Sequence, residues 1–390
     1  MALREKFGRP LRLGIVGGGP DSWIGRMHRG AAEMDGWFRV TAGVFSSDPA
    51  HSRAAGASLG LDPARSYGDV GEMLVSESGR ADGIDAVAIM TPNDTHHAFA
   101  AAALDARLDV ICDKPVTNDF AQARDLVERA RAQERIFAIA HGYSAYPMTR
   151  YARHLVAEGA IGPIRLVQVE YIQNGLATRV EDGPQTNRLR WVLDPARSGQ
   201  ALVLSAIGCH AQHLASFVCG LDVARVAADV GTLRPGRKVV DHVSALLEFD
   251  GGARGTFTVT QAAAGGENDI RLRVYGEGGL IDWSHREPSY LKLAIQGEPV
   301  RTITRGDPFL PPEIIALGRT PRGHPEGLRE AFANIYAEVA QERMARELGE
   351  FFPYFPYPRI EEGAHTMAFI EACVASQARG GWVDVARRRA

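Results

Sequence analysis

A short apolar segment that runs into three consecutive glycines constrains the fold of this chain more than any other feature. Residues 11–16 (LRLGIV) are followed by Gly17, Gly18 and Gly19. An apolar β-strand that breaks at glycines and leads into a helix is typical of a dinucleotide-binding unit. The glycines allow the backbone to turn tightly and to approach a pyrophosphate, which the positive end of the following helix attracts. The next suitable glycine is Gly25, so the usual GxGxxG spacing carries a three-residue insertion, and the turn alone is weak evidence.

The segments that follow alternate between apolar runs and helical patterns. The expected strands are residues 40–45, 84–90, 108–112 and 136–140, and the expected helices are residues 24–35, 49–59, 96–106 and 120–133. Strands that alternate with helices predict a parallel, doubly wound sheet, so we expect an α/β fold. Ligands bind such a sheet at the carboxyl ends of its strands. In this chain those ends carry Gly17 to Gly19, then Ser46 and Ser47, then Thr91, Pro92 and Asn93, and then Asp113, Lys114 and Pro115.

The end of the second strand indicates which dinucleotide the chain binds. NAD-binding sheets usually carry an acid there, which binds the ribose hydroxyls. Ser46 and Ser47 stand at this place, Asp48 is displaced by two positions, and Arg53 follows. The serines could bind the ribose hydroxyls, or they could accept a 2′-phosphate together with Arg53. We expect NAD because no arginine lies directly at the strand tip, and NADP stays open.

The pattern changes after residue 145. Strand-like runs with β-branched residues then follow one another, at residues 164–171, 223–232, 242–249, 255–260 and 270–276. Asp250, Gly251 and Gly252 indicate a hairpin turn between two of them. The length of 390 residues also suits two domains of ordinary size. We therefore expect a first domain over residues 1–145 and an α/β domain with a mostly antiparallel sheet over residues 146–390, closed by a C-terminal helix.

Composition excludes several classes of protein. Lys plus Arg number 44 and Asp plus Glu number 47, so a net charge of −3 gives no field that attracts nucleic acid or an anionic membrane. No apolar run approaches the ~20 residues of a membrane helix, and the charged N-terminus has no apolar signal core. The four cysteines form no CxxC pair or metal-type cluster. We expect a soluble cytoplasmic protein without a metal, a nucleic-acid partner or a membrane partner.

Lys114 is the first candidate for chemistry. A lone lysine is ordinarily a solvated surface charge. Lys114, however, follows a strand end and stands between Asp113 and Pro115, and a proline cannot continue a strand ladder. This position favours a functional role at the ligand-binding edge of the sheet.

Several ordered motifs together resemble the glucose–fructose oxidoreductase/inositol dehydrogenase (Gfo/Idh/MocA) family, over roughly residues 11–385. They are the glycine turn with residues 25–28 (GRMH), Thr91-Pro92-Asn93 with His96, Asp113-Lys114-Pro115, residues 190–199 with Trp191, residues 206–213 (AIGCHAQH) and residues 323–327 (GHPEG). The resemblance implies an N-terminal Rossmann domain and a C-terminal α/β domain with a large, mostly antiparallel open sheet. It also implies a small-molecule carbohydrate substrate and a homo-oligomer, either a dimer or a tetramer.

The resemblance implies roles for particular residues. Lys114 would bind the reacting hydroxyl, and His210 would act as general base in oxidation, a task that suits the unperturbed histidine pKa near 6.5. The family's assisting and trailing aspartates are replaced here by Ala206 and His213, so Ser205 or His213 could relay the proton instead. The expected cofactor contacts are Gly17, Gly19, Trp23, Ile24, Ser46, Ser47, Arg53, Thr91, Pro92, Asn93, His96, Asp113, Lys114 and Trp191.

Other side chains are candidates for the substrate and for a different reaction. Tyr143 and Tyr146 follow the fifth strand and are further catalytic candidates. The expected substrate contacts are Arg179, Arg190, Arg197, His213 and His324, and the arginines would suit an anionic sugar. We expect an NAD-dependent oxidoreductase that removes hydride from a secondary hydroxyl of a sugar, a sugar derivative or inositol. The alternatives are a redox glycoside hydrolase that recycles its NAD, for which tyrosine or histidine would remove a proton next to the transient ketone, and a non-catalytic dinucleotide sensor.

Overall fold

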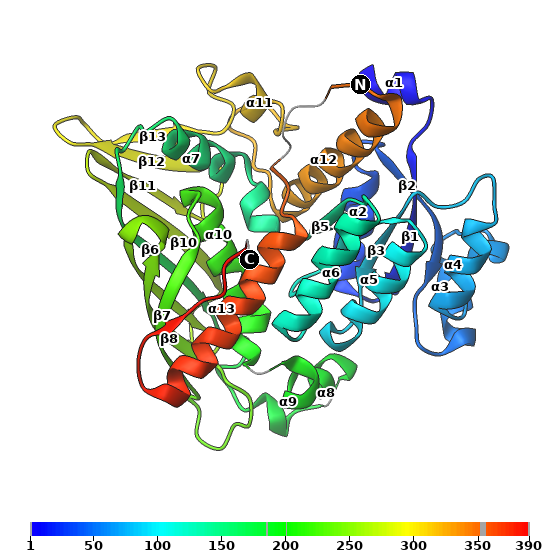
Figure 1. Ribbon diagram of the computed structural model, residues 1–390, viewed down its shortest axis with the longest axis horizontal. Helices are drawn as coiled ribbons and strands as arrows, with labels where there is room; N and C mark the ends of the chain where they lie inside the picture. Colours follow the sequence, from blue (N-terminus) through cyan, green and yellow to red (C-terminus); the bar gives the residue numbers. More distant parts are fainter. Residues whose placement is uncertain (1, 185, 200, 352–355, 389–390) are drawn as a thin grey trace. The chain divides into compact units, whose positions relative to one another are not determined.

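The structure, a computed structural model, describes residues 2–184, 186–199, 201–351 and 356–388 (Figure 1). The chain divides into two compact units. The first consists of Met1–Thr117, Ala121–Gly142 and Leu328–Ile360, and the second of Asn118–Phe120, Tyr143–Gly327 and Glu361–Ala390. The single boundary expected at residue 145 assigns the segment Leu328–Ile360 to the second domain. The contacts of this segment place it in the first unit.

The first unit contains the parallel sheet that the sequence predicts, which confirms the α/β fold. Its strands are β1 (Leu11–Gly17), β2 (Phe38–Val44), β3 (Ala86–Met90), β4 (Asp109–Cys112) and β5 (Phe137–Ile139). Within the described residues they pair in the order β2-β1-β3-β4-β5, and every pair is parallel. The order reverses between β1 and β3, which is the switch point where such sheets bind their ligands.

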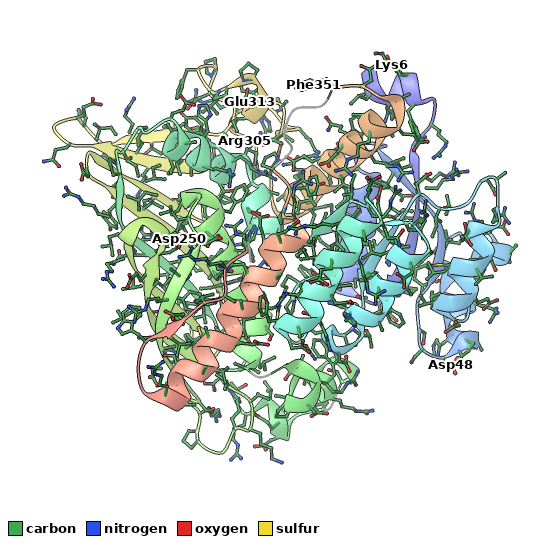
Figure 2. The ribbon with its side chains drawn as sticks, in the orientation of Figure 1. Lys6, Asp48, Asp250, Arg305, Glu313 and Phe351 are labelled. Atoms are coloured by element: carbon green, nitrogen blue, oxygen red, sulfur yellow. The ribbon has the colours of Figure 1, made fainter. Side chains whose placement is uncertain are left out.

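Helices cover this sheet. They are α1 (Ala2–Phe7), α2 (Trp23–Glu33), α3 (Pro49–Ser58), α4 (Val70–Ser78), α5 (His96–Asp105), α6 (Phe120–Ala132) and α12 (Leu328–Leu348). Side-chain caps start several of them: Asp48, labelled in Figure 2, accepts a hydrogen bond of 2.7 Å from the His51 amide at the start of α3. Helix α12 lies along α2, although about three hundred residues separate them in the sequence (Figure 1).

The second unit is built on a nine-stranded sheet among the described residues. Its strands are β6 (Ile164–Gln173), β7 (Val223–Gly231), β8 (His242–Phe249), β9 (Arg254–Thr260), β10 (Asn268–Gly276), β11 (Gly279–Ser284), β12 (Tyr290–Ile295), β13 (Arg301–Thr304) and β14 (Val383–Asp384). Their order is β13-β12-β11-β10-β6-β9-β8-β7-β14, and in the part of the chain that the structure describes only β6 and β9 pair in parallel. The hairpin expected at Asp250 to Gly252 joins β8 and β9, and Gly251 (φ 82°) and Gly252 (φ 90°) supply its left-handed backbone.

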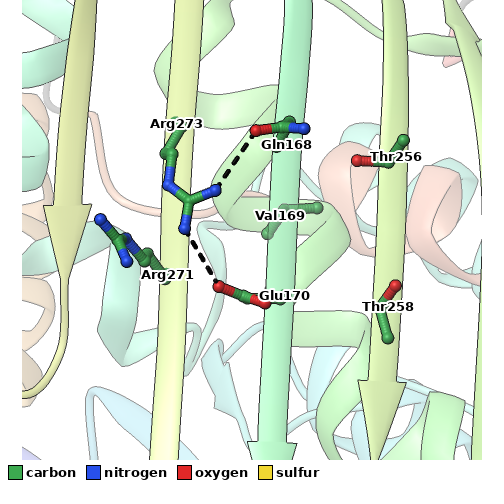
Figure 3. A pocket seen from close by; sticks show the side chains of 7 residues that line it. All are labelled: Gln168, Val169, Glu170, Thr256, Thr258, Arg271 and Arg273. Atoms are coloured by element: carbon green, nitrogen blue, oxygen red, sulfur yellow. Dashed lines mark hydrogen bonds and ion pairs between the residues drawn. The ribbon is translucent and has the colours of Figure 1, made fainter.

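The two faces of this sheet differ. Helices α7 (Pro147–Ala157), α10 (Cys209–Cys219) and α13 (Ile360–Arg379) pack on one face, and every residue of α10 is buried. The other face carries polar side chains that alternate with buried ones along β6, β9 and β10, and seven residues of these strands line a pocket (Figure 3). Arg273 contacts Gln168 at 3.3 Å and Glu170 at 3.5 Å there, so its charge is compensated in place.

Three short helices complete the second unit: α8 (Asn187–Val192), α9 (Pro195–Ser198) and α11 (Pro312–Ile315). Among the helices of the described ranges, none has both the length and the apolar character that crossing a membrane requires.

Candidate active site

The glycine turn of the first unit has the geometry that a pyrophosphate site needs. Gly17 and Gly18 have positive φ angles of 86° and 62°, which a side chain would strain. A Cβ atom on Gly25 would lie 2.2 Å from the Gly18 carbonyl oxygen, so α2 begins in direct contact with the turn. Ser22 caps α2 by accepting a 3.1 Å hydrogen bond from the Gly25 amide. Gly25 thus fills the third glycine's role in close packing despite the insertion, and the turn and the start of α2 fit a dinucleotide.

The tips of β3 and β4 are joined by His96. Its Nδ1 lies 2.8 Å from the Pro115 carbonyl oxygen and its Nε2 lies 2.9 Å from that of Thr91. A neutral imidazole has one N–H, so both carbonyls are hydrogen-bonded only when the ring is protonated. Burial lowers the pKa of His96 below its ordinary value despite the charge of Asp113 and the two carbonyls, so the neutral ring donates to one of the two carbonyls. His96 is expected to contact the cofactor, and both of its nitrogens lie beside backbone carbonyls at the two strand tips.

Asp113 and Lys114 form the next part of the site. The Asp113 Oδ1 accepts a 2.9 Å hydrogen bond from the Lys114 amide, and the peptide bond between Lys114 and Pro115 is cis. The buried His28 bonds the Tyr336 hydroxyl through Nδ1 at 2.8 Å, and its Nε2 lies 4.0 Å from Asp113. Burial alone would raise the pKa of Asp113, but His28, Lys114 and His96 lower it to about 2. The carboxylate therefore stays charged beside Lys114.

At the expected ribose end of the site, the charge of Arg53 is paired with a carboxylate of the protein. Arg53 donates two hydrogen bonds from Nη2 to Glu72, at 3.0 and 3.1 Å. Ser46 Oγ accepts a 3.1 Å bond from the amide of Asp48, whose carboxylate caps α3 rather than standing at the strand tip. Trp23 is largely exposed at the start of α2. These contacts leave Arg53 paired with Glu72 within the protein.

His210 lies in the second unit at the start of α10. The preceding turn, Leu204–Gly208, is a π-helix, a form that is rare and frequent at functional sites. His210 is 9% exposed, and its ring meets the ring of Tyr143 edge-on, with centroids 5.0 Å apart. The structure therefore brings together two residues that the sequence analysis selected separately. Tyr146 extends the cluster, with its ring 6.4 Å from that of Tyr143 and 5.8 Å from that of His285.

The positions of the missing aspartates have different surroundings. Ala206 packs against an apolar cluster formed by Leu176, Val192, Leu202 and Val239, and Trp191 packs against the same cluster. His213 is buried, stacks on Phe217 and places its Nε2 3.7 Å from Glu362 of α13. Burial lowers the pKa of His213 despite the neighbouring carboxylate. His210 and His213 thus face different neighbours, although they lie three residues apart.

The expected substrate arginines are not gathered by the fold. Arg179 pairs with Asp182 at 3.2 Å on the surface, while Arg190 and Arg197 are exposed on α8 and α9. His324 is exposed in the segment before α12, where its carbonyl accepts a bond from Arg305. No cluster of three or more histidine, cysteine, aspartate or glutamate residues suited to a metal occurs in the part of the chain that the structure describes.

Four polar residues that hydrogen bonds connect to Tyr143 were not selected from the sequence. They are Tyr171, Gln173, Gln261 and Asn268, and hydrogen bonds link them to Tyr143. Gln173, Gln261 and Asn268 lie at or next to the end of a strand, where polar side chains interrupt an apolar pattern, and Tyr171 lies two residues before the end of β6. That signal was present in the sequence, but only the register of β10, β6 and β9 shows that these side chains meet.

Known proteins match the chain over almost its whole length. The model of the oxidoreductase family with an NAD-binding Rossmann fold matches residues 11–141, and that of the GFO/IDH/MocA C-terminal domain matches residues 149–282. The uncharacterised oxidoreductase YfiI of Bacillus subtilis is 33% identical over 386 residues, which cover 96% of this chain and 97% of that protein.

Two further relatives are known by an activity or a bound ligand. The levoglucosan dehydrogenase of Pseudarthrobacter phenanthrenivorans is 25% identical, with 96% of this chain and 98% of that protein covered. The crystal structure of an inositol dehydrogenase homolog from Azotobacter vinelandii, complexed with NAD+, is 35% identical with a TM-score of 0.92, and the match covers 97% of this chain and 98% of that one. This chain belongs to the Gfo/Idh/MocA family of oxidoreductases, and its first unit carries an NAD-binding Rossmann fold.

Proposed function

We propose that this protein oxidises a secondary hydroxyl of a sugar, a sugar derivative or an inositol, with NAD as hydride acceptor. The proposal is carried by two observations, each made within one unit: the first unit has a dinucleotide turn and a charged Asp113–Lys114 strand tip, and the second has the buried His210–Tyr143 cluster. Relatives described as acting on levoglucosan or as inositol dehydrogenase homologs support this substrate class.

Each catalytic group has a separate task in the proposed reaction. NAD, when bound, supplies the hydride acceptor. Lys114 binds the reacting hydroxyl, and its ammonium stabilises the charge that develops on the oxygen. His210 removes the hydroxyl proton, and the same group returns the proton when the reaction runs toward the alcohol. We further propose that Gly17, Gly19, Trp23 and Ile24 hold the pyrophosphate, that Ser46 and Ser47 hold the ribose, and that NAD is preferred because Glu72 occupies Arg53.

The test combines turnover with binding. Wild-type protein is incubated with NAD and a panel of pyranosides and inositols, and the absorbance of the reduced cofactor is followed. Lys114→Met and His210→Asn are expected to lower kcat by about 10²- to 10⁴-fold while NAD affinity, measured by calorimetry, is retained. Lys292→Met and His51→Asn change exposed residues of the same types and serve as matched controls. Wild-type protein that binds no NAD would refute the proposal.

A redox glycoside hydrolase is the second candidate, because the fold places Tyr143 beside His210. A second base there could remove a proton next to a transient ketone and so expel a glycosidic leaving group. This reaction releases a sugar from a glycoside without net reduction of NAD and incorporates solvent deuterium beside the oxidised carbon. Turnover without that label would exclude it.

We also propose, from the family resemblance, that the protein acts as a cytoplasmic homo-oligomer.

A further inference from the structure

Three side-chain amides form a row across one end of the sheet in the second unit. Gln173 ends β6, Asn268 begins β10 directly opposite it, and Gln261 follows β9 on the other side of β6. Gln261 donates from Nε2 to the Gln173 Oε1 at 2.9 Å, and Gln173 in turn donates to the Asn268 Oδ1. Asn268 donates from Nδ2 to the Tyr143 hydroxyl at 3.3 Å. The row therefore runs from Gln261 to the tyrosine that touches His210.

The hydrogen bonds in this row share one direction in the structure. Tyr171 donates its one proton to the Asn268 Oδ1 at 2.8 Å. Tyr143 must then be the donor in the 2.6 Å bond that joins the two phenol oxygens. Each amide nitrogen consequently points along the row toward the tyrosines, and each amide oxygen points back toward Gln261. The side chains cannot rotate singly without breaking a bond to a neighbour.

This polarity leaves one acceptor at the start of the row. Gln261 is 9% exposed, and its Oε1 has no hydrogen-bond partner among the residues that the structure describes. The backbone of Gln261 is held on both sides, because its amide donates to the Asp241 carbonyl at 3.0 Å and its carbonyl accepts from Leu176 at 2.7 Å. A buried acceptor that is oriented and unpaired requires a donor from elsewhere.

We propose that the Gln261 Oε1 accepts a hydrogen bond from a hydroxyl group of the substrate and that Gln261 is a specificity residue of this site. The proposal rests on the proposed function. An amide oxygen needs a donor, so it selects a neutral polyhydroxylated compound over a carboxylate or phosphate, which offers only acceptors at pH 7. The row thus favours a polyol or neutral sugar at this position rather than the anionic sugar that the surface arginines suggested.

The test removes the acceptor and the donor separately. Gln261→Met keeps the length of the side chain but removes the acceptor, and Gln296→Met at an exposed position is the matched control. Initial rates are measured with NAD and with myo-inositol, levoglucosan and their singly deoxygenated analogues. We expect Gln261→Met to lower kcat/KM for the intact polyol by about 10- to 100-fold, with NAD affinity unchanged. For the analogue that lacks the contacting hydroxyl, the wild type and the variant should have the same kcat/KM.

The results separate the two proposals. Equal effects of Gln261→Met on all analogues, or no effect on any, would overturn the role of Gln261 and indicate that water satisfies its Oε1. If the variant does not fold, the wild-type protein with the singly deoxygenated analogues still tests the role of Gln261. The analogue that lacks the contacting hydroxyl should have a kcat/KM at least about 10-fold lower than that of the intact polyol. Losses below about threefold for every analogue would overturn the proposal. Wild-type protein that turns over none of the polyols, yet binds one less tightly after Gln261→Met in calorimetry, would refute the proposed function and leave the role of Gln261 standing.

Discussion

The contact between Gly25 and the glycine turn gives a sharp prediction. In Gly25→Ala the new Cβ would lie 2.2 Å from the Gly18 carbonyl oxygen, 2.6 Å from its carbonyl carbon and 2.7 Å from its Cα. All three atoms belong to the backbone, so no rotamer change relieves the clash. Helix α2 has to move away from the turn by about 1 Å to restore an ordinary contact.

Gly30 provides the matched control on the same helix. A Cβ on Gly30 would meet nothing closer than the Arg329 side chain, at 3.6 Å. Alanine is favoured over glycine in helices by about 0.5–1 kcal/mol, a gain that both substitutions share to a first approximation. The difference between the two variants in the free energy of unfolding therefore measures the clash, and we expect Gly25→Ala to be less stable than Gly30→Ala by about 1–3 kcal/mol.

The same displacement weakens NAD binding. Losing one charge-assisted hydrogen bond to the pyrophosphate costs about 1.5–3 kcal/mol, which corresponds to an affinity about 10- to 100-fold lower. Unfolding in urea followed by tryptophan fluorescence gives the stabilities, and calorimetric titration gives the affinity for NAD. Gly25→Ala with the wild-type affinity, or Gly30→Ala with an equal loss, would show that close approach of α2 to the turn does not build the site.

Two further predictions concern buried charges. Because the pKa of Asp113 falls from 3.8 to about 2 on folding, its carboxylate stabilises the fold above about pH 4, by about 2.5 kcal/mol, and that contribution disappears as the pH falls toward 2. The gap in unfolding free energy between the wild type and Asp113→Asn should therefore shrink between pH 5 and about pH 3 in urea titrations, and a gap that widens would contradict the assignment. Glu77 is fully buried against Arg65 and accepts a 2.8 Å bond from the Tyr67 hydroxyl, so Glu77→Ala should lower stability by about 3–5 kcal/mol. Glu72→Ala breaks the half-exposed pair with Arg53 and should cost less than about 1 kcal/mol, and similar losses for both variants would argue against the role of burial.

The parallel sheet was predictable because its signals are local. Each of its strands is a short apolar run that ends in glycine, proline or a polar residue, and all five expected strands form. Helix α4, which the sequence analysis omitted, also had a local signal: Asp69 caps it by accepting a 3.1 Å bond from the Glu72 amide. Missing it was an error of interpretation rather than a lack of information in the sequence.

The parts of the site that escaped prediction depend on distant pairings. The hydrogen bond between His28 and Tyr336 spans 308 residues, and the amide row joins Gln261 and Asn268 to Gln173 across 88 and 95 residues. No local pattern encodes these contacts, because they follow from strand register and from the return of α12 to α2. The same reason explains His96: its motif marked it as functional, but only the positions of the Thr91 and Pro115 carbonyls show which groups occupy its nitrogens.

The return of α12 determines when the NAD-binding unit is complete. Because Leu328–Ile360 belongs to the unit that begins at the N-terminus, a ribosome must synthesise nearly the whole chain before that unit has all of its parts. Tyr336, the partner of the buried His28, is among the parts that arrive late. A fragment cut at residue 145 would expose the side of α2 that α12 covers, so the dinucleotide-binding half cannot be transferred between proteins as one contiguous piece. Gene fusions or shuffled variants of this chain would have to carry Leu328–Ile360 together with the N-terminal part of its unit.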